Sequence, residues 1–449
     1  MGNSIANAGD LDGDGRADLI VGSPEYADTS SRGRVRVYSG DALAGGLGSV
    51  VLAQHLGPVN SGSRFGEVVC GGGDLNGDGV PEFLVGAPRM GSDSSPALSL
   101  GRVFVYSGLS ATPMATFSGP GHSSLGVALA FVGDVNADGF GDIAAGGHGW
   151  ASPPGFGSGV VWIISGEWIV SYSLGQPPTS PMLLYSLQGD QTNDRFGAAV
   201  CGIGDVDGDG HADFAANAQN PAGGYTRFHS GLTGAEFARI GPGWPGDQRG
   251  YTLAALGDVN GDGRADIGMT APTTDQVPNQ GFGTERGLVE VVNGSWLRRR
   301  ALGLPPSQPP FLHRIGGDRD HLRLGITLAA GGDVNGDGKD DFYVSAPGKR
   351  LANAHPPSLY LYSGADGSLL RRWTGHASSN WGWRVALLGD LDQDGLPELA
   401  VSNPFAHNQE GRVEIRSGTE LSTGSPWCFG DSCPCSADAD HAGCRNSTE

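Results

Sequence analysis

The chain has 449 residues, 78 of them Gly and 28 Pro, and its 48 acidic against 28 basic residues give a formal net charge of −20. Glycine without a Gly-X-Y period excludes collagen, and 38% hydrophobic residues with 9 Trp, 10 Tyr and 16 Phe indicate a folded protein. The acidic balance disfavours nucleic acid as a partner, and no apolar run is long enough to insert into a membrane.

A repeated acidic pattern, D-x-(D/N)-x-D-G-x-x-(D/E), divides the chain into units spaced 53 to 75 residues apart. A Gly stands eight residues before each copy, and five copies are followed by a tripeptide such as Gly86-Ala87-Pro88. A strand-like run that ends in Ser-Gly or Asn-Gly, such as Val103 to Gly108, then completes the unit. The seven copies begin at Asp10, Asp74, Asp134, Asp205, Asp258, Asp333 and Asp390. These landmarks in fixed order indicate seven structural repeats.

Each repeat reads as β structure. Runs such as Val35 to Tyr38 alternate with period 2, and the run after each acidic loop, such as Asp18 to Val21, is short and apolar. No convincing stretch of ten or more residues has the helical period. Four short strands per unit, the last exemplified by Val50 to His55, predict an all-β fold: a seven-bladed β-propeller of four-stranded antiparallel blades over residues 1–425. A Cys-rich tail follows over residues 426–449.

The Phe-Gly, acidic-loop and Gly-Ala-Pro landmarks resemble the FG-GAP repeats of the integrin α-subunit propeller and its bacterial relatives. The resemblance implies a calcium-binding propeller that serves as a binding or adhesion module without catalysis of its own. A carbohydrate-binding or scaffold domain of a larger secreted enzyme is the alternative, and a purely structural repeat in a surface protein is a third. The chain holds no Arg-Gly-Asp, no H-E-x-x-H, no G-x-S-x-G and no P-loop motif.

The acidic loops place oxygen-bearing side chains at positions 1, 3, 5 and 9, with Gly at position 6 to reverse the chain. Position 7 has no constant residue type, which suits a backbone carbonyl ligand. Several carboxylates with all-oxygen ligation select Ca²⁺, and we expect up to seven structural ions. The predicted ligands, loop by loop, are Asp10, Asp12, Asp14 and Asp18; Asp74, Asn76, Asp78 and Glu82; Asp134, Asn136, Asp138 and Asp142; Asp205, Asp207, Asp209 and Asp213; Asp258, Asn260, Asp262 and Asp266; Asp333, Asn335, Asp337 and Asp341; Asp390, Asp392, Asp394 and Glu398.

Two other interpretations of these loops are weaker. An EF-hand requires Glu at position 12, where this chain has apolar residues such as Val21 and Met269. A plain Asp-Gly hairpin turn requires two such residues, and not four oxygens at fixed spacing. The loops hold half of the acidic residues, so bound calcium would account for most of the acidity.

In an antiparallel blade, the turn after the first strand is the calcium loop, and the turn after the third strand lies on the same face of the ring. We therefore expect a protein or glycan ligand on the opposite face, where Tyr26, Trp150, Phe156 and Trp244 are candidate contacts. Two further aromatic residues, Trp381 and Trp383, either join this surface or belong to the core between blades, which we favour. The basic run Arg298-Arg299-Arg300 is either a solvated turn, which we favour, or an anion site.

The ends of the chain give further expectations. Cys70 and Cys201 fall on inner strands of non-adjacent blades and are expected to be buried and unbonded. The tail cysteines, Cys428, Cys433, Cys435 and Cys444, form either disulfides, which an extracellular or cell-surface location favours, or a metal site. The residues before Asp10 show no signal peptide, and blade seven lacks an evident fourth strand. We therefore expect a fragment with an exposed seam between blades one and seven.

Overall fold

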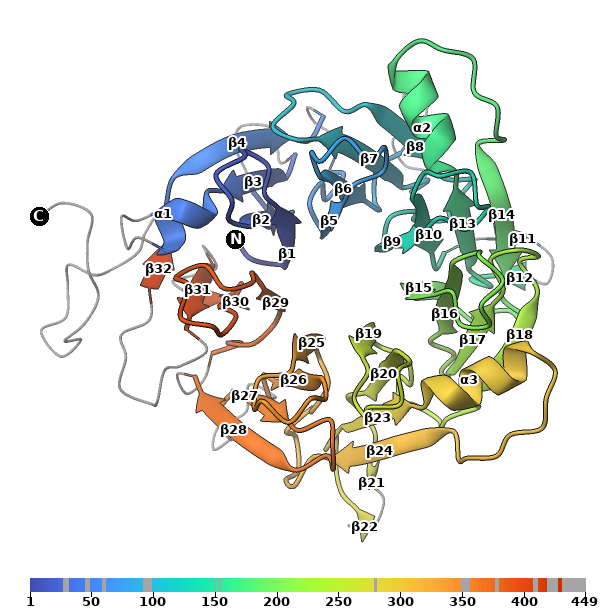
Figure 1. The fold of residues 1–449 in the computed structure, drawn as a ribbon, viewed down its shortest axis with the longest axis vertical. Helices are drawn as coiled ribbons and strands as arrows, with labels where there is room; N and C mark the ends of the chain where they lie inside the picture. Colours follow the sequence, from blue (N-terminus) through green and yellow to red (C-terminus); the bar gives the residue numbers. More distant parts are fainter. Residues whose placement is uncertain are drawn as a thin grey trace, which may run out of the picture.

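Seven four-stranded antiparallel sheets stand around a central axis in the computed structural model (Figure 1). It describes residues 1–26, 32–44, 49–58, 62–91, 99–149, 151–152, 155–277, 281–348, 356–375, 379–406, 411–417 and 427–429. The predicted seven-bladed β-propeller is confirmed. Each blade places its strands in sequence order from the inside to the outside of the ring, here called A, B, C and D.

The strands recur at the predicted landmarks. The A strands are β1 (Ser4–Gly9), β5 (Val68–Gly73), β9 (Ala128–Gly133), β15 (Phe196–Gly204), β19 (Leu253–Gly257), β25 (Leu328–Gly332) and β29 (Val385–Leu387). The B strands are β2 (Asp18–Ser23), β6 (Glu82–Ala87), β10 (Asp142–Gly147), β16 (Asp213–Ala218), β20 (Asp266–Ala271), β26 (Asp341–Ala346) and β30 (Leu399–Asn403). Every residue of these B strands is buried, because blades pack on both of their faces.

The outer strands complete the blades. The C strands are β3 (Arg34–Tyr38), β7 (Arg102–Ser107), β13 (Val160–Ile164), β17 (Tyr225–His229), β23 (Leu288–Val292), β27 (Ser358–Tyr362) and β31 (Arg412–Arg416). The D strands are β4 (Val51–Leu56), β8 (Ala115–Ser118), β14 (Leu183–Gln188), β18 (Glu236–Ile240), β24 (Phe311–Gly316), β28 (Leu369–Thr374) and β32 (Trp427–Phe429). Blades three and five each add a small hairpin between strands B and C: β11 (Ala151–Ser152) with β12 (Gly155–Phe156), and β21 (Gln276–Val277) with β22 (Gly281–Phe282).

Glycines let successive blades approach closely. Gly86, in the Gly-Ala-Pro landmark of blade two, lies so close to the Gly126 carbonyl of blade three that a Cβ atom would overlap it. Gly126 is the landmark Gly of blade three and has φ +93°, which other residues rarely adopt. The two sequence landmarks therefore meet at the boundary between neighbouring blades.

The C–D connections of blades one, three and five contain helices, so the interpretation of each unit as β throughout is wrong there. They are α1 (Gly40–Ala44), α2 (Gly166–Ser173) and α3 (Gly294–Ala301). The two longer helices begin after capping side chains, Ser165 and Asn293, which accept hydrogen bonds from backbone N–H groups in the first turn. The basic run 298–300 lies in the last turn of α3, and not in a turn between strands. Within the described ranges, no helix is long and apolar enough to cross a membrane.

Blade seven is complete, and the expected open seam is wrong. The missing fourth strand is β32, whose Trp427 pairs with Ile415 of β31, and it lies beyond residue 425, where we placed the end of the propeller. Strand β29 contacts β1, and Leu388 and Val413 of blade seven share a hydrophobic cluster with Ile5 of blade one. The ring closes because this apolar contact across the seam is the same kind that joins the other blades.

The cysteines fall into two groups. Cys70 and Cys201 are unbonded and half-buried, and burial raises the pKa of each thiol to about 11. Such thiols are protonated at neutral pH. The expectation that they are unbonded is confirmed, whereas their side chains are less buried than expected. Of the tail cysteines, only the backbone of Cys428 is described, and Cys433, Cys435 and Cys444 lie outside the described residues. Their pairing stays a prediction.

Candidate metal centre

The last side chain of each acidic loop is the buried anchor of the loop. Asp142 at position 9 of the third loop is completely buried at the start of β10, and its two carboxylate oxygens accept from the Val135 and Gly166 N–H groups, both at 2.8 Å. The same pair of bonds recurs at Asp18, Asp213, Asp266 and Asp341. The position 9 carboxylate thus ties the loop to the end of strand C.

This anchor gives a physical reason for the Ser-Gly and Asn-Gly landmark. Gly166 supplies the N–H group that Asp142 accepts, and a Cβ atom there would collide with the Gly141 carbonyl. Gly40, Gly231, Gly294 and Gly364 are in the same position. The landmark is visible in the sequence, but its hydrogen bond to the acidic loop is visible only in the structure.

The earlier positions of the loop turn their oxygens inward through backbone hydrogen bonds. In the first loop, Asp10 at position 1 accepts from the N–H groups of Gly13 and Gly15 at 2.7 and 2.8 Å. Asp14 at position 5 accepts from Arg16 N at 2.8 Å. These bonds fix the loop without using all the acceptor capacity of the carboxylates, because each oxygen has two lone pairs.

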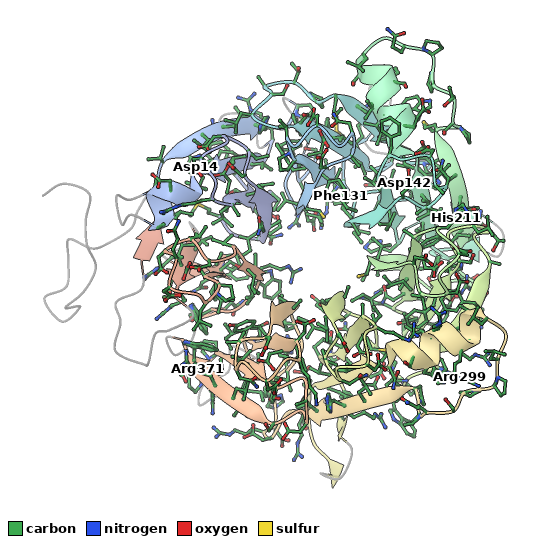
Figure 2. All side chains as sticks on the ribbon, in the orientation of Figure 1. Asp14, Phe131, Asp142, His211, Arg299 and Arg371 are labelled. Carbon is green, nitrogen blue, oxygen red and sulfur yellow. The ribbon has the colours of Figure 1, made fainter. Side chains whose placement is uncertain are left out.

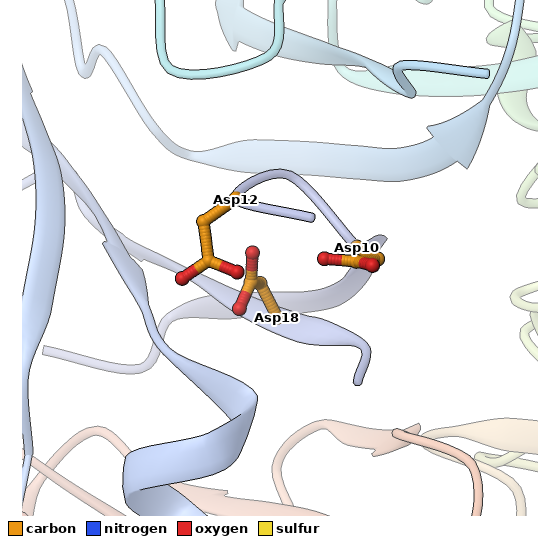
Figure 3. Close-up of side chains that lie close together, drawn as sticks. All are labelled: Asp10, Asp12 and Asp18. Atoms are coloured by element: carbon orange, nitrogen blue, oxygen red, sulfur yellow. The ribbon is translucent and has the colours of Figure 1, made fainter. Parts of the chain in front are cut away.

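Three loops bring their carboxylates together into tight clusters. Oxygens of Asp10, Asp12 and Asp18 lie within 4.8 Å of one another (Figure 3). The equivalent clusters are Asp205, Asp207 and Asp213 in the fourth loop, and Asp390, Asp392 and Glu398 in the seventh. All three loops have Asp at position 3. In the loops with Asn there, the amide joins the same turn, as where Asn136 Nδ2 donates to Asp138 Oδ2 at 2.8 Å.

The electrostatics of these clusters favour a bound cation. Burial, with neighbouring carboxylates adding to it, raises the pKa of Asp18 and Asp213 to about 6 and of Asp142 and Asp266 to about 7. Burial likewise raises the pKa of Glu398 to about 7, and its Oε1 is buried without a hydrogen-bond partner in the described part of the chain. A buried oxygen without a donor, beside two further carboxylates, fits a hard cation with oxygen ligands.

Hydroxyl groups on the C–D connections also contact the loops, which sequence analysis missed. Ser180 Oγ donates to Asp138 Oδ2 at 3.0 Å, and Ser295 Oγ donates to Asp262 Oδ2 at 2.7 Å. Arg298 of α3 lies beside Gly208 in the acidic loop of the neighbouring blade four. The C–D connection of blade three and helix α3 therefore contact the candidate metal loops. Figure 2 shows α3, marked by Arg299, over the outer part of the ring.

The candidate ligand residues on the other face are dispersed. Phe156 and Trp244 are 66% and 57% exposed, in blade three and in the link between blades four and five. Tyr26 is half-buried, with the Arg34 guanidinium 3.9 Å from its ring centre, and Trp150 lies outside the described residues. Trp381 is buried in the core beside blade seven, as expected. No single recognition site unites these residues in the described structure.

Family models match three segments of the chain. An FG-GAP repeat model matches residues 1–38 and 65–106, and an FG-GAP-like repeat model matches residues 333–401. These segments contain the whole of the first, second, sixth and seventh acidic loops.

Among characterised proteins, the chain is 32% identical over 208 residues to integrin alpha-4 of Xenopus laevis, covering 45% of this chain and 18% of that protein. It is 34% identical over 152 residues to integrin alpha-E of Homo sapiens, covering 32% and 13%. It is 28% identical over 373 residues to phosphatidylinositol-glycan-specific phospholipase D of Bos taurus, covering 75% and 42%. The matches thus span less than half the length of these relatives.

Raptor of Chaetomium thermophilum shares the fold alone, with a TM-score of 0.51, 10% identity, and coverage of 94% of this chain and 28% of Raptor.

Proposed function

We propose that this chain, an FG-GAP repeat protein resembling the integrin α-subunit propeller, is a calcium-stabilised binding or adhesion module that works outside the cell or at its surface. The observation that carries the proposal is the convergence of carboxylates in the acidic loops, with a buried anchor at position 9. We propose no catalysis by the propeller itself.

Calcium is the cation that best suits this donor set. The residues at positions 1, 3, 5 and 9 supply carboxylate and amide oxygens, and position 7 would supply a backbone carbonyl. Ca²⁺ takes six to eight oxygen ligands in flexible geometry, whereas Zn²⁺ prefers nitrogen and sulfur. When bound, the cation would neutralise carboxylates that otherwise repel one another and hold the A–B hairpin of its blade. Up to seven ions would then stabilise the ring, in an environment where calcium is abundant.

The ligand would approach from the face opposite the calcium loops. Because the strands of each blade are antiparallel, the A–B loops and the C–D connections share one face, and the B–C and D–A connections form the other. We propose a protein or glycan ligand on that second face. The net charge of −20 argues against nucleic acid, and we propose no membrane insertion.

A second candidate is a carbohydrate-binding or scaffold domain of a larger secreted enzyme. It is favoured by the alignment with the phospholipase D, which extends over 75% of this chain but 42% of the enzyme. A native partner domain with catalytic activity, isolated together with this chain, would favour this candidate.

Metal analysis tests the calcium assignment. The purified chain, dialysed against calcium and then washed, should retain close to seven ions, and chelation should lower its melting temperature by many degrees. Asp142→Asn should lose one ion, whereas Asp366→Asn, at an exposed C–D turn on the same face, should lose none. Absence of bound calcium, or equal ion loss in both variants, would contradict the assignment.

A further inference from the structure

A pocket of about 620 Å³ opens between the link joining blades four and five, the B–C connection of blade five and the link to blade six. Its lining includes Trp244, Asp247 and Gln248 on one side, and Asp275, Glu285 and Arg323 on the other. These connections belong to the face opposite the candidate metal loops, and the β21–β22 hairpin projects beyond the ring from the same B–C connection (Figure 1). The volume is in the usual range for sites that bind small molecules.

Trp244 lies on a turn whose backbone is held by hydrogen bonds with buried or neighbouring side chains. The carboxylate of Asp247, only 4% exposed, accepts from Trp244 N at 2.8 Å and from Arg249 N at 3.0 Å. Thr273 Oγ1 of blade five donates to Gly246 O at 2.8 Å and joins the turn to the next blade. The backbone that carries the exposed indole is therefore already ordered. Less conformational entropy of the protein is then lost when a ligand binds.

The opposite wall is built from paired polar groups. Glu285 forms an ion pair with Arg323 at 3.2 Å, and its N–H donates to Asp275 Oδ1 at 2.7 Å. Glu285 has φ +46°, whereas the equivalent position in blade three is Gly157 at φ +74°. Both carbonyl oxygens accept from the Arg two residues before the landmark Gly: Arg195 N donates to Gly157 O at 2.8 Å, and Arg323 N donates to Glu285 O at 3.0 Å. Blade five thus keeps a carboxylate side chain where the backbone favours Gly.

Each of the three carboxylates that line the pocket already has a hydrogen-bond or ion-pair partner within the protein. Asp247 accepts hydrogen bonds from two backbone N–H groups, and Glu285 pairs with Arg323, so neither carboxylate requires a bound cation. Because a carboxylate has about four acceptor sites, both can also accept hydrogen bonds from a ligand. Three carboxylates against one guanidinium disfavour an anionic ligand. An exposed indole face beside hydrogen-bond donors and acceptors suits a molecule with an apolar C–H face and neutral hydroxyl groups at its edge.

We propose that this pocket binds a neutral saccharide, with one sugar ring stacked on Trp244 and its hydroxyl groups directed to Asp275, Glu285 and Gln248. The inference rests on the proposed function, a binding module with its ligand on this face, and specifies the ligand class and the site. The pocket limits the size of the ligand and disfavours an anionic one, but its lining does not single out a particular sugar.

The test uses the full chain in calcium and an array of neutral and anionic oligosaccharides and basic peptides, followed by calorimetry with the best neutral sugar. Trp244→Ala should weaken binding at least tenfold, and Trp244→Phe should restore most of it, because a flat aromatic face is retained. Tyr172→Ala, which removes a 58% exposed ring on α2 at the opposite face, should leave affinity unchanged. Affinity should also be the same in 50 and 500 mM NaCl, since the ligand is uncharged.

Several results would overturn the inference. Capture of basic peptides with strong salt dependence would identify a cationic ligand, and sugar binding unaffected by Trp244→Ala would place the site elsewhere. Calcium-stabilised protein that binds no neutral sugar would refute this inference and leave the proposed function standing. Protein that neither binds calcium nor gains stability from it would refute the proposed function itself. The calcium content and the melting temperature of each variant are measured beside those of the unmodified chain, so a misfolded variant is recognised directly.

Discussion

Removal of the proposed calcium ions should reverse the usual pH dependence of stability in the acid range. Asp142 and Asp266 are completely buried, and burial raises their pKa from 3.8 to about 7. Between pH 5 and 6 each is therefore protonated in the folded, metal-free chain and ionised in the unfolded chain. The folded state binds more protons, so each group lowers the free energy of unfolding by about 1.4 kcal/mol per pH unit as the pH rises.

Buried histidines act in the opposite direction and set the net magnitude. Burial lowers the pKa of His55 and His229 to about 4 and also lowers the pKa of His148, so stability is lost as the pH falls below 6.5. Against two imidazoles with a pKa lowered to about 4, five carboxyl groups have a pKa raised to about 6 or 7: Asp18, Asp142, Asp213, Asp266 and Glu398. Carboxyl groups therefore dominate, and at about 1.4 kcal/mol per pH unit for each fully titrating group in excess, the free energy of unfolding should fall by roughly 2 kcal/mol or more from pH 5 to 6.

Urea denaturation followed by Trp fluorescence measures this slope. Metal-free protein, obtained by chelation and dialysis into calcium-free buffer, should become less stable from pH 5 to 6. Calcium-loaded protein should become more stable, because the cation competes with protons for the carboxylates. Asp142→Asn should reduce the metal-free slope by about 1.4 kcal/mol per pH unit, and Asp366→Asn should leave it unchanged. A flat or rising free energy of unfolding in the metal-free protein would refute the reasoning.

Three further predictions concern stability. Gly86→Ala should lower the free energy of unfolding in urea by about 3 kcal/mol, because its Cβ would meet the Gly126 carbonyl. Gly121→Ala, which faces open space, should change this free energy by less than about 0.5 kcal/mol, and equal losses would contradict the close-packing argument. Trp381→Phe should cost about 2 kcal/mol, because the indole Nε1 donates to the buried Glu414 Oε2 at 3.0 Å, and an unchanged midpoint would show that this bond contributes nothing. Calcium at 100 times the dissociation constant should add about 2.7 kcal/mol per site, so the melting temperature should keep rising with calcium concentration; a melting temperature independent of calcium would exclude linked sites.

Local chemistry explains why the sequence predicted the repeats and the loops. The four oxygen positions of an acidic loop lie within nine residues, and Gly at position 6 permits the turn, so the convergence of Asp10, Asp12 and Asp18 follows from spacing. The B strands were recognisable because burial on both faces demands continuous apolar runs such as Leu19 to Val21. A helix of eight residues such as α2 is too short to show a convincing period, and it forms because Ser165 caps it and the blade supports it.

Non-local contacts decided what the sequence could not. The short strand β32 has little pattern of its own and becomes a strand by pairing with β31, which is how blade seven is completed. The pocket joins Trp244, Glu285 and Arg323 from three separate connections, and no spacing in the chain relates them. Sequence by itself determined the number of blades and the acidic loops, because both depend on neighbours within a repeat. Tertiary structure alone decided the closure of the ring and the composition of the opposite face, because these depend on which repeats become neighbours in space.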